Sequence, residues 1–324
     1  MRRLISMIVL ICCAIGPAPF ASAAETWPDK PVHFVVPFPA GSVTDLVSRI
    51  VADGLSKKLK QTIVVDNKPG ASGELGNEFI ARAAPDGYTI GLGTASTLAV
   101  APSLNPHLAY DPLKDFAFVS LVGQAPYLLV VNSEVPAKNI KELIDLAKAK
   151  PGALNYSTVG PASLAQFAGS LFSSMAKVKL TAIPYKSATH AALDLVKGRI
   201  QMQFGATAAT LPFINQGKLR ALAVTSQERL DVLPDVPTMS EAGLPGYEAV
   251  LWMAVVAPRA TPPDIVERLN QDIRAVLAER DVKKRLAGEV LQVETSSPAE
   301  LQTRIATDIA KWRALAKEMG IKPE

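Results

Sequence analysis

The sequence predicts an α/β protein of two lobes, with a chain that passes between the lobes twice. Apolar strands alternate with amphipathic helices from Pro31 to about Phe204, which is typical of sheets covered by helices. The same alternation starts afresh near Pro126, so a second unit of similar kind follows the first. A stretch rich in Pro and Gly from Leu233 to Pro263 then precedes a helical tail, which indicates a return to the first lobe.

The first unit holds three predicted strands. Apolar runs place them at residues 32–36, 63–65 and 88–92. Between the first two, apolar residues recur at helical spacing from Val43 to Leu55, and a glycine-rich turn leads into a second helix over residues 74–84. Because strands and helices alternate, we expect parallel strands with helices on both faces.

The second unit repeats this pattern and is followed by a helical tail. Helices are predicted over residues 139–149 and 164–172, and near the C-terminus after Ser297-Pro298-Ala299-Glu300, which combines an N-cap, a proline at the first helical position and a capping-box Glu. Strands are predicted at residues 127–131, 154–157, 183–185, 199–204 and 219–224.

These patterns predict the domain limits. We assign residues 25–124 and 246–324 to lobe 1, and residues 125–245 to lobe 2. The two crossings are expected near residues 122–126 and 242–252, where a hinge would lie.

The first 24 residues have the layout of a secretory signal peptide. Two arginines precede an apolar run over residues 4–15, and Ala21-Ser22-Ala23 is a small-x-small cleavage signature. The run is shorter than the roughly 20 residues of a membrane-spanning helix. We therefore expect cleavage after Ala23 or Ala24 and release of the mature protein into the periplasm. Separately, we expect the mature protein to be a monomer.

The composition of the mature chain argues against several classes of function. Both cysteines lie inside the signal, and none of the three histidines has a partner at metal-ligand spacing, so neither a metal site nor a cofactor is expected. The 34 basic residues nearly balance the 30 acidic ones and form no basic run, which argues against nucleic acid as a partner.

Enzymatic motifs are also missing from the sequence. There is no GxSxG, no Walker A loop and no GxGxxG. Ser174 and Lys177 match the S-x-x-K of penicillin-binding enzymes, but its companion motifs are absent. We therefore do not expect an enzyme.

Five loops lead from a predicted strand towards a helix, and all are rich in Gly, Ala, Ser and Thr. Ligands of open α/β sheets bind beyond the carboxyl ends of strands, where such loops lie. Backbone N–H groups at helix starts are unpaired and suit a carboxylate or phosphate. The candidate ligand-binding residues are Phe38, Pro39, Ala40, Gly41, Ser42, Thr44 and Asp45 in the first loop, and Thr94, Ser96, Thr97, Ser157, Thr158, Gly160, Ser163, Tyr185, Gly205 and Ala206 in the others.

The first loop also fits a purely structural interpretation. Ser42 would cap the following helix and Asp45 would close a capping box. The two interpretations are compatible, because a cap fixes the N–H groups that a ligand would use.

Seven motifs in order along the mature chain resemble one known family. They are PVHFVVPFPAGSVTD at residues 31–45, VDNKPGASG at 65–73, APDGYT at 84–89, PYK at 184–186, GKLRALA at 217–223, PDVPT at 234–238 and EAGLPGY at 241–247. This set is similar to that of the Bug proteins, periplasmic solute receptors linked to tripartite tricarboxylate transporters.

The resemblance implies a fold, a ligand and a partner. The fold would be that of a type II-like periplasmic binding protein, with two α/β domains and two hinge crossings. The ligand would be a small organic carboxylate held by backbone N–H groups and bridging waters rather than by arginine. Residues 38–45, Gly160, Ser163 and Tyr185 match the positions of the site, and the partners would be the membrane subunits of the transporter.

Five positions depart from the usual family pattern, and two of them are Ala162, where the family has a glycine, and Ser170, where it has a glutamate. Ser42 stands where the family has a second glycine, Gln166 where it has a histidine, and Ser187 where a glycine follows the lysine of Pro184-Tyr185-Lys186. These departures lie near the expected cleft and bear on which carboxylate is bound.

Two alternatives to a transport receptor share the predicted scaffold. A ligand-sensing receptor that docks on a sensor kinase would use the same binding chemistry. A secreted enzyme is disfavoured, because the sequence shows no set of acid, base and nucleophile.

Overall fold

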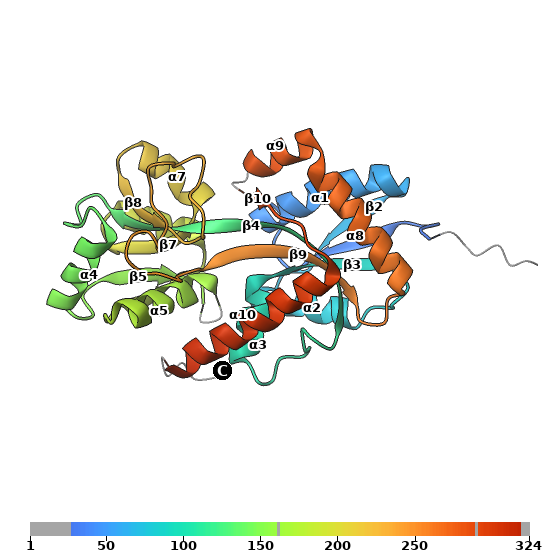
Figure 1. Cartoon of the computed structure of the whole chain (residues 1–324), viewed down its shortest axis with the longest axis horizontal. Helices are drawn as coiled ribbons and strands as arrows, with labels where there is room; N and C mark the ends of the chain where they lie inside the picture. The colour runs from blue at the N-terminus through green and yellow to red at the C-terminus, as the bar shows by residue number, and fades with distance from the viewer. Residues whose placement is uncertain (1–26, 161–162, 289–290, 319–324) are drawn as a thin grey trace, which may run out of the picture.

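The computed structural model describes residues 27–160, 163–288 and 291–318. The predicted signal peptide and its cleavage site lie outside the described residues. Two α/β lobes lie side by side, and strands β4 (Phe116–Asn132) and β9 (Val250–Pro258) run between them (Figure 1). The two-lobed α/β architecture agrees with the sequence prediction.

Lobe 1 is built on the parallel strands β2 (Ile63–Asn67), β1 (Val32–Val36) and β3 (Thr89–Thr94), in that order. Its helices and turns are α1 (Val43–Leu59), η1 (Ala71–Gly73), α2 (Glu74–Ala81), η2 (Ser96–Val100), α3 (Ala101–Leu104), α8 (Pro263–Ala278) and α9 (Arg280–Gly288). The predicted strand at residues 88–92 is shifted by one residue and extends to Thr94.

Lobe 2 has the parallel strands β7 (Met202–Ala206), β5 (Asn155–Thr158) and β6 (Thr181–Pro184). Its helices are α4 (Ile140–Ala149), α5 (Leu164–Ala176), α6 (Ala188–Val196) and α7 (Thr207–Asn215). Strands β7 and β8 (Leu219–Val224) both pair with the far half of β4.

The strands at the centre of the molecule are antiparallel, so the expectation of wholly parallel sheets was wrong there. Strand β9 is antiparallel to both β3 and β4, and β4 is antiparallel to β7. The physical reason is the route of the chain, which leaves lobe 1 along β4 and comes back along β9 in the opposite direction. The segment predicted as a returning connection therefore contains a nine-residue strand.

Strand β4 is a single strand of 17 residues, although the sequence predicted a strand only at residues 127–131. It pairs with β9 as far as Pro126, which lies opposite Val250, and with β7 from Tyr127 onward. Nearly every residue of β4 is buried on both faces, so its sequence lacks the alternation that marks a half-exposed strand.

The apolar core lies on both faces of this continuous sheet. One cluster packs α1, α8 and α9 on lobe 1, another packs α6 and α7 on lobe 2, and the largest extends through both lobes. Helix α10 (Pro298–Glu318) contributes to the largest cluster. There the ring of Trp312 packs edge to face on Phe167 of α5, with the ring centroids 5.4 Å apart. The short strand β10 (Gln292–Val293) pairs with β4.

The predicted start of the last helix is confirmed. Ser297 Oγ accepts the Glu300 N–H at 3.2 Å, and the Glu300 carboxylate accepts the Ser297 N–H at 2.8 Å. This reciprocal capping box places α10 directly after a buried serine, Ser296, whose hydroxyl accepts the Leu121 N–H of β4.

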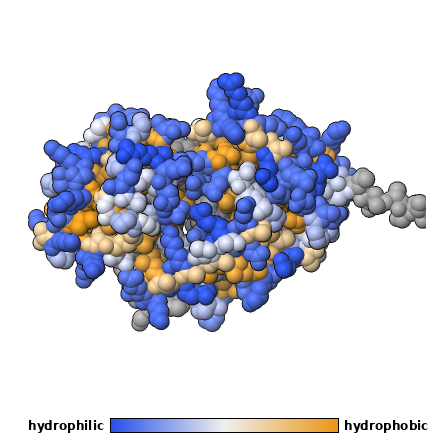
Figure 2. Space-filling view, viewed as in Figure 1, coloured by the Kyte–Doolittle hydropathy of each residue, from blue (hydrophilic) through white to orange (hydrophobic). Residues whose placement is uncertain are grey.

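The surface is largely polar on the face drawn in Figure 2, with apolar residues in small patches between hydrophilic ones. In the part of the chain that the structure describes, no helix is both long and apolar enough to cross a membrane.

Asn270 provides a test of how the parts of lobe 1 are joined. This fully buried residue of α8 donates from Nδ2 to the carbonyls of Val119 (2.7 Å) and Ser296 (2.8 Å). Replacing it in Asn270→Leu leaves two buried carbonyls unpaired, so the free energy of unfolding should fall by about 1–3 kcal/mol. Denaturant unfolding measures this change.

The adjacent residue supplies the control. Gln271 is exposed on the same helix, and Gln271→Leu should change the free energy of unfolding by less than about 0.5 kcal/mol. Equal effects of the two substitutions would contradict the role given to Asn270.

Candidate functional site

The loop between β1 and α1 is organised around the carboxylate of Asp45. Its side chain is only 3% exposed. Oδ2 accepts the Gly41 N–H at 2.8 Å and Arg49 Nε at 3.0 Å, and Oδ1 accepts Asn67 Nδ2 at 2.9 Å. Asn67 also donates to the Phe38 carbonyl at 3.1 Å, so one acidic side chain fixes the loop from both ends.

These contacts set the protonation of Asp45. Burial by itself would raise the pKa of this carboxyl, but hydrogen bonds from Arg49, Gly41 and Asn67 together hold the pKa below its ordinary value. The carboxylate is therefore charged at neutral pH, and both of its oxygens accept hydrogen bonds from the protein.

The first turn of α1 keeps free donors that point out of the helix start. Ser42 is the N-cap, and its hydroxyl accepts the Asp45 N–H at 3.3 Å. The N–H groups of Val43 and Thr44 form no hydrogen bond with any described residue. Such orphan groups carry the partial positive charge of the helix N-terminus, so the structure offers a small anion two donors here.

Gly41 has a left-handed backbone conformation, which favours glycine and lets the loop turn into the start of α1. Its φ is +78°, and a Cβ at this position would meet nothing within 4 Å. The space beside Gly41 is open, so its missing side chain leaves room next to the donors of α1. Its own N–H is used by Asp45, which the sequence did not reveal.

Lobe 2 carries a matching helix start at α5. Ser163 is the N-cap, its hydroxyl donates to the Gly160 carbonyl at 2.7 Å and accepts the Gln166 N–H at 3.3 Å. The N–H groups of Leu164 and Ala165 form no hydrogen bond with described residues. Gly160 has φ +124°, a conformation that favours glycine.

The two lobes approach each other at Gly160. A Cβ built on this residue would lie 4.0 Å from Ser72 Oγ of lobe 1. A Cβ on Gly73, in the same turn as Ser72, would lie 2.8 Å from Thr97 Cγ2 and 3.1 Å from Phe38 Cζ. The loop after β1, the turn at residues 70–73 and the η2 turn after β3 therefore meet on the lobe 1 side.

The turn at residues 70–73 was not among the predicted site residues. All four of its residues have positive φ, and two of them, Ala71 (φ 44°) and Ser72 (φ 53°), are not glycine. Backbone strain of this kind concentrates at functional sites. The glycines at 70, 73 and 76 were the available signal, since they mark a turn that ordinary residues rarely form.

Other predicted residues are buried or paired within the protein. Thr94 and Thr97 are fully buried, and the Thr97 hydroxyl accepts the Thr94 N–H at 3.1 Å. The Tyr185 hydroxyl donates to Asp194 at 3.1 Å. Ser96 is half-buried, at the start of the π-helical turn η2. The predicted loop that holds Thr94, Ser96 and Thr97 is thus partly the end of strand β3 and partly the helical turn η2.

The remaining predicted residues lie at the carboxyl edge of the lobe 2 strands. Ser157 and Thr158 are buried at the end of β5, and Gly205 and Ala206 end β7. Ala206 is opposite Tyr127 of β4, so this edge adjoins the crossing between the lobes.

Comparison with known proteins identifies the architecture. The sequence signature of the tripartite tricarboxylate transporter family receptor (TctC) matches residues 47–321. The chain belongs to this family. Protein BugT of Bordetella pertussis is 36% identical over 323 residues, covering 99% of both chains.

Solved structures of TctC-type receptors have the same fold. A protein of R. palustris solved with adipate has a TM-score of 0.82 and 35% identity, over 92% of this chain and all of that one. MatC of Rhodopseudomonas palustris, solved with bound malate, has a TM-score of 0.77 and 34% identity, over 89% and 99%. The periplasmic binding protein BugD has a TM-score of 0.79 and 34% identity, over 92% and 100%.

Three of the five expected departures, Ser42, Gln166 and Ser187, have local structural roles. Ser42 and Ser187 are N-caps of α1 and α6, since their hydroxyls accept the N–H groups of Asp45 and His190. Gln166 donates from Nε2 to the Tyr156 hydroxyl at 3.0 Å. The serines therefore replace glycine where a helix start gains from a side-chain acceptor.

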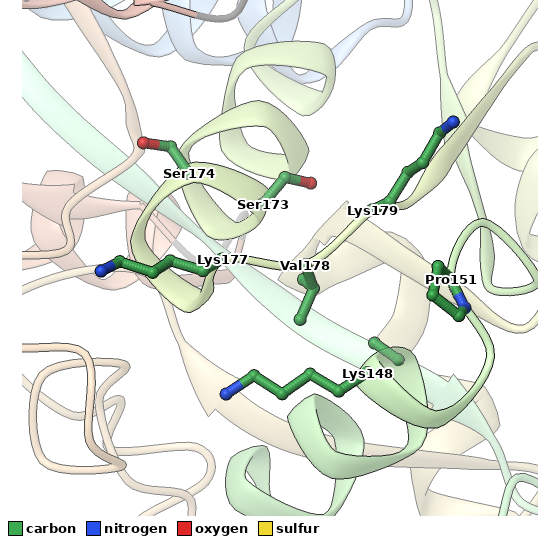
Figure 3. Close-up of a pocket in the computed structure, with 8 residues that line it drawn as sticks. Lys148, Pro151, Ser173, Ser174, Lys177, Val178 and Lys179 are labelled. Atoms are coloured by element: carbon green, nitrogen blue, oxygen red, sulfur yellow. The ribbon is translucent and has the colours of Figure 1, made fainter.

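A pocket of about 470 Å³ lies at the far end of α5 from Ser163. Figure 3 shows Lys148 and Lys177 beside Val178, with Lys179 pointing away from them. Ser174 of the S-x-x-K match also lines it, but its hydroxyl donates to Glu318 Oε1 at 2.5 Å and not to Lys177. This arrangement lacks the nucleophile–base contact of a catalytic pair.

The described residues also contain no group of three or more His, Cys, Asp and Glu side chains placed to hold a metal ion. His33 pairs with Asp66 at 2.6 Å, and His190 is exposed in the first turn of α6.

The network around Asp45 predicts a pH-dependent effect of Asp45→Asn. The amide would turn an NH₂ group towards existing donors, so at about pH 7 the free energy of unfolding should fall by about 1–3 kcal/mol. Because the pKa of Asp45 is lowered in the folded state, its contribution is present above the unfolded pKa of about 3.9 and is lost as the pH falls through the folded value.

Denaturant unfolding of the wild type and of Asp45→Asn, from about pH 7 down to below about pH 4, measures the effect. The difference between wild type and variant should shrink as the pH falls below about 4. A difference that stays constant, or grows with acidity, would contradict the assignment of Asp45 as a buried, charged organiser.

Proposed function

We propose that this receptor captures a small organic carboxylate between its lobes and presents it to the membrane subunits of a tripartite tricarboxylate-type transporter. Family membership supports the transporter link. Two relatives about one-third identical were solved with adipate and malate, both of which are small carboxylates. The proposed binding residues are those predicted from the sequence other than Thr94 and Thr97, which pair with each other in the interior, together with the turn at residues 70–73.

The observation that carries the proposal is the pair of free helix starts, one in each lobe. Within the described ranges, the N–H groups of Val43 and Thr44 in lobe 1 have no hydrogen-bond partner, and neither do those of Leu164 and Ala165 in lobe 2. A carboxylate has two oxygens, each able to accept such donors, and the helix N-termini favour a negative charge.

No cationic side chain is needed in this scheme. Arg49 is the arginine nearest the first loop in sequence, and its guanidinium binds Asp45 and Asn67. A neutral donor set holds the anion without the energetic cost of desolvating a buried guanidinium. It also allows different carboxylates to use the same loops, because backbone groups impose little side-chain specificity.

The rest of the proposed function concerns compartment and movement. We place the mature protein in the periplasm after cleavage at Ala23 or Ala24, with lobes at residues 25–124 plus 246–324 and at 125–245. The change of partner strand between Pro126 and Tyr127 of β4 supports a hinge there, and closure would bring the two helix starts onto one ligand.

A pair of glycine substitutions tests the site. A ligand at 100 times its dissociation constant should stabilise the wild-type protein by about 2.7 kcal/mol, which raises the melting midpoint by several degrees, at about 2 °C or somewhat less per kcal/mol for a chain of this length. In Gly41→Val this shift should vanish, because the side chain enters the open space beside the donors of α1. A thermal-shift screen of organic acids measures it.

Gly217→Val is the matched control. Gly217 has φ +69° and, like Gly41, nothing within 4 Å of an added Cβ, but it lies in the turn between α7 and β8. The control variant suffers the same kind of backbone strain as Gly41→Val, but it should keep the full ligand-induced rise in melting midpoint. A screen in which amines or neutral sugars stabilise the protein and no organic acid does would refute the proposal.

A further inference from the structure

Gln203 is a polar residue in the middle of a buried strand. It is only 3% exposed, and its neighbours Met202 and Phe204 belong to the large apolar core. Side chains alternate along a strand, so Gln203 lies on the opposite face of β7 from these two, together with Gly205. This is the face that α6 and α7 cover.

The amide of Gln203 has no hydrogen-bond partner among the residues that the structure describes. Its Oε1 is buried without a hydrogen bond, and Nε2 forms none with the described residues either. An unpaired buried amide is destabilising, and native proteins keep such groups where water, an ion or a ligand completes them. Packing alone gives no reason for glutamine here, since leucine has a similar volume and no polar atoms.

The side chain of Gln203 leans towards the cleft end of its strand. A Cβ built on Gly205 would lie 3.1 Å from Gln203 Cδ and 3.1 Å from Thr210 Cγ2. The amide therefore occupies the room that Gly205 leaves free. Gly205 is one residue from Ala206, where β7 ends and α7 begins, so the amide lies near the carboxyl edge at which ligands of such sheets bind.

A second unpaired polar group lies beside it. Ser157 of β5 is the register partner of Gln203 and is 2% exposed. Its hydroxyl forms no hydrogen bond with the described residues. Ser157 precedes Gly160 by three residues, and Gly160 is the residue that approaches lobe 1. An amide and a hydroxyl without partners thus adjoin the same edge as the donors of α5.

We propose that Gln203, together with Ser157, reads a polar substituent on the bound carboxylate. The receptor thereby selects hydroxy-carboxylates over the corresponding unsubstituted acids. The inference rests on the proposed function and adds the class of ligand. A hydroxyl group on the ligand can both accept from Nε2 and donate to an oxygen, whereas a methylene leaves the amide and the serine unpaired, which sites of this kind disfavour strongly.

Matched ligand pairs test this inference. Titration calorimetry of the full mature protein would compare malate with succinate, and 2-hydroxyglutarate with glutarate. For at least one pair the wild type should bind the hydroxylated acid about tenfold or more tightly. In Gln203→Leu this ratio should fall towards one, mainly through weaker binding of the hydroxylated acid, and Ser157→Ala should reduce it in the same direction.

The controls separate a binding role from a structural one. Gln302→Leu, at an exposed position of α10, should leave the ratio unchanged, and melting midpoints without ligand report whether each variant is folded. A Gln203→Leu protein with an altered midpoint but the wild-type ratio would overturn the inference and leave the proposed function intact. Failure of the wild type to bind any carboxylate would overturn both.

Discussion

The antiparallel pairing of β4 with β9 is the constraint on which the two-lobed structure depends. The two strands pair from Phe116 and Pro258 to Pro126 and Val250, and both continue a sheet that other strands extend on either side. Because one sheet runs through both lobes, the carboxyl edges of the parallel strands in each lobe are turned towards the same region. The facing helix starts of α1 and α5 follow from this geometry.

The candidate site depends on a division of labour between side chains and backbone. Asp45, Asn67, Ser42 and Ser163 satisfy one another or the loop backbone, and this leaves the first N–H groups of two helices free. The Asp45 carboxylate and the Arg49 guanidinium hold the loop in place instead of contacting a ligand. A ligand at the helix starts would therefore contact neutral backbone donors. Gln203 differs from this pattern, since its amide has no partner in the described part of the chain, and that contrast singles it out.

Much of this organisation was readable from the sequence. Apolar periodicity predicted most elements of both lobes, and the first loop identified Ser42 as the cap of the helix that follows it. The full length of β4 was not predictable, because a strand buried on both faces shows no alternation. Strand β9 was hidden by the prolines and glycines around it, and its direction depends on how the lobes dock.

The site was less predictable in its details than the fold. The sequence placed Gly41 among the candidate ligand-binding residues, but its N–H donates to Asp45. Thr94 and Thr97 have the right chemistry, yet they pair with each other in the interior. The importance of Ser72 and Gln203 depends on neighbours that lie far away in the chain, such as Gly160 for the first and Ser157 for the second.

A crystal structure with a bound carboxylate from the acid screen tests the central claim most directly. The account predicts carboxylate oxygens within about 2.7–3.2 Å of backbone nitrogens at the starts of α1 and α5, directly or through one water. Asp45 should keep its contacts with Gly41 and Asn67. A carboxylate held instead by an ion pair with a lysine or arginine side chain, with both helix starts unoccupied, would contradict it.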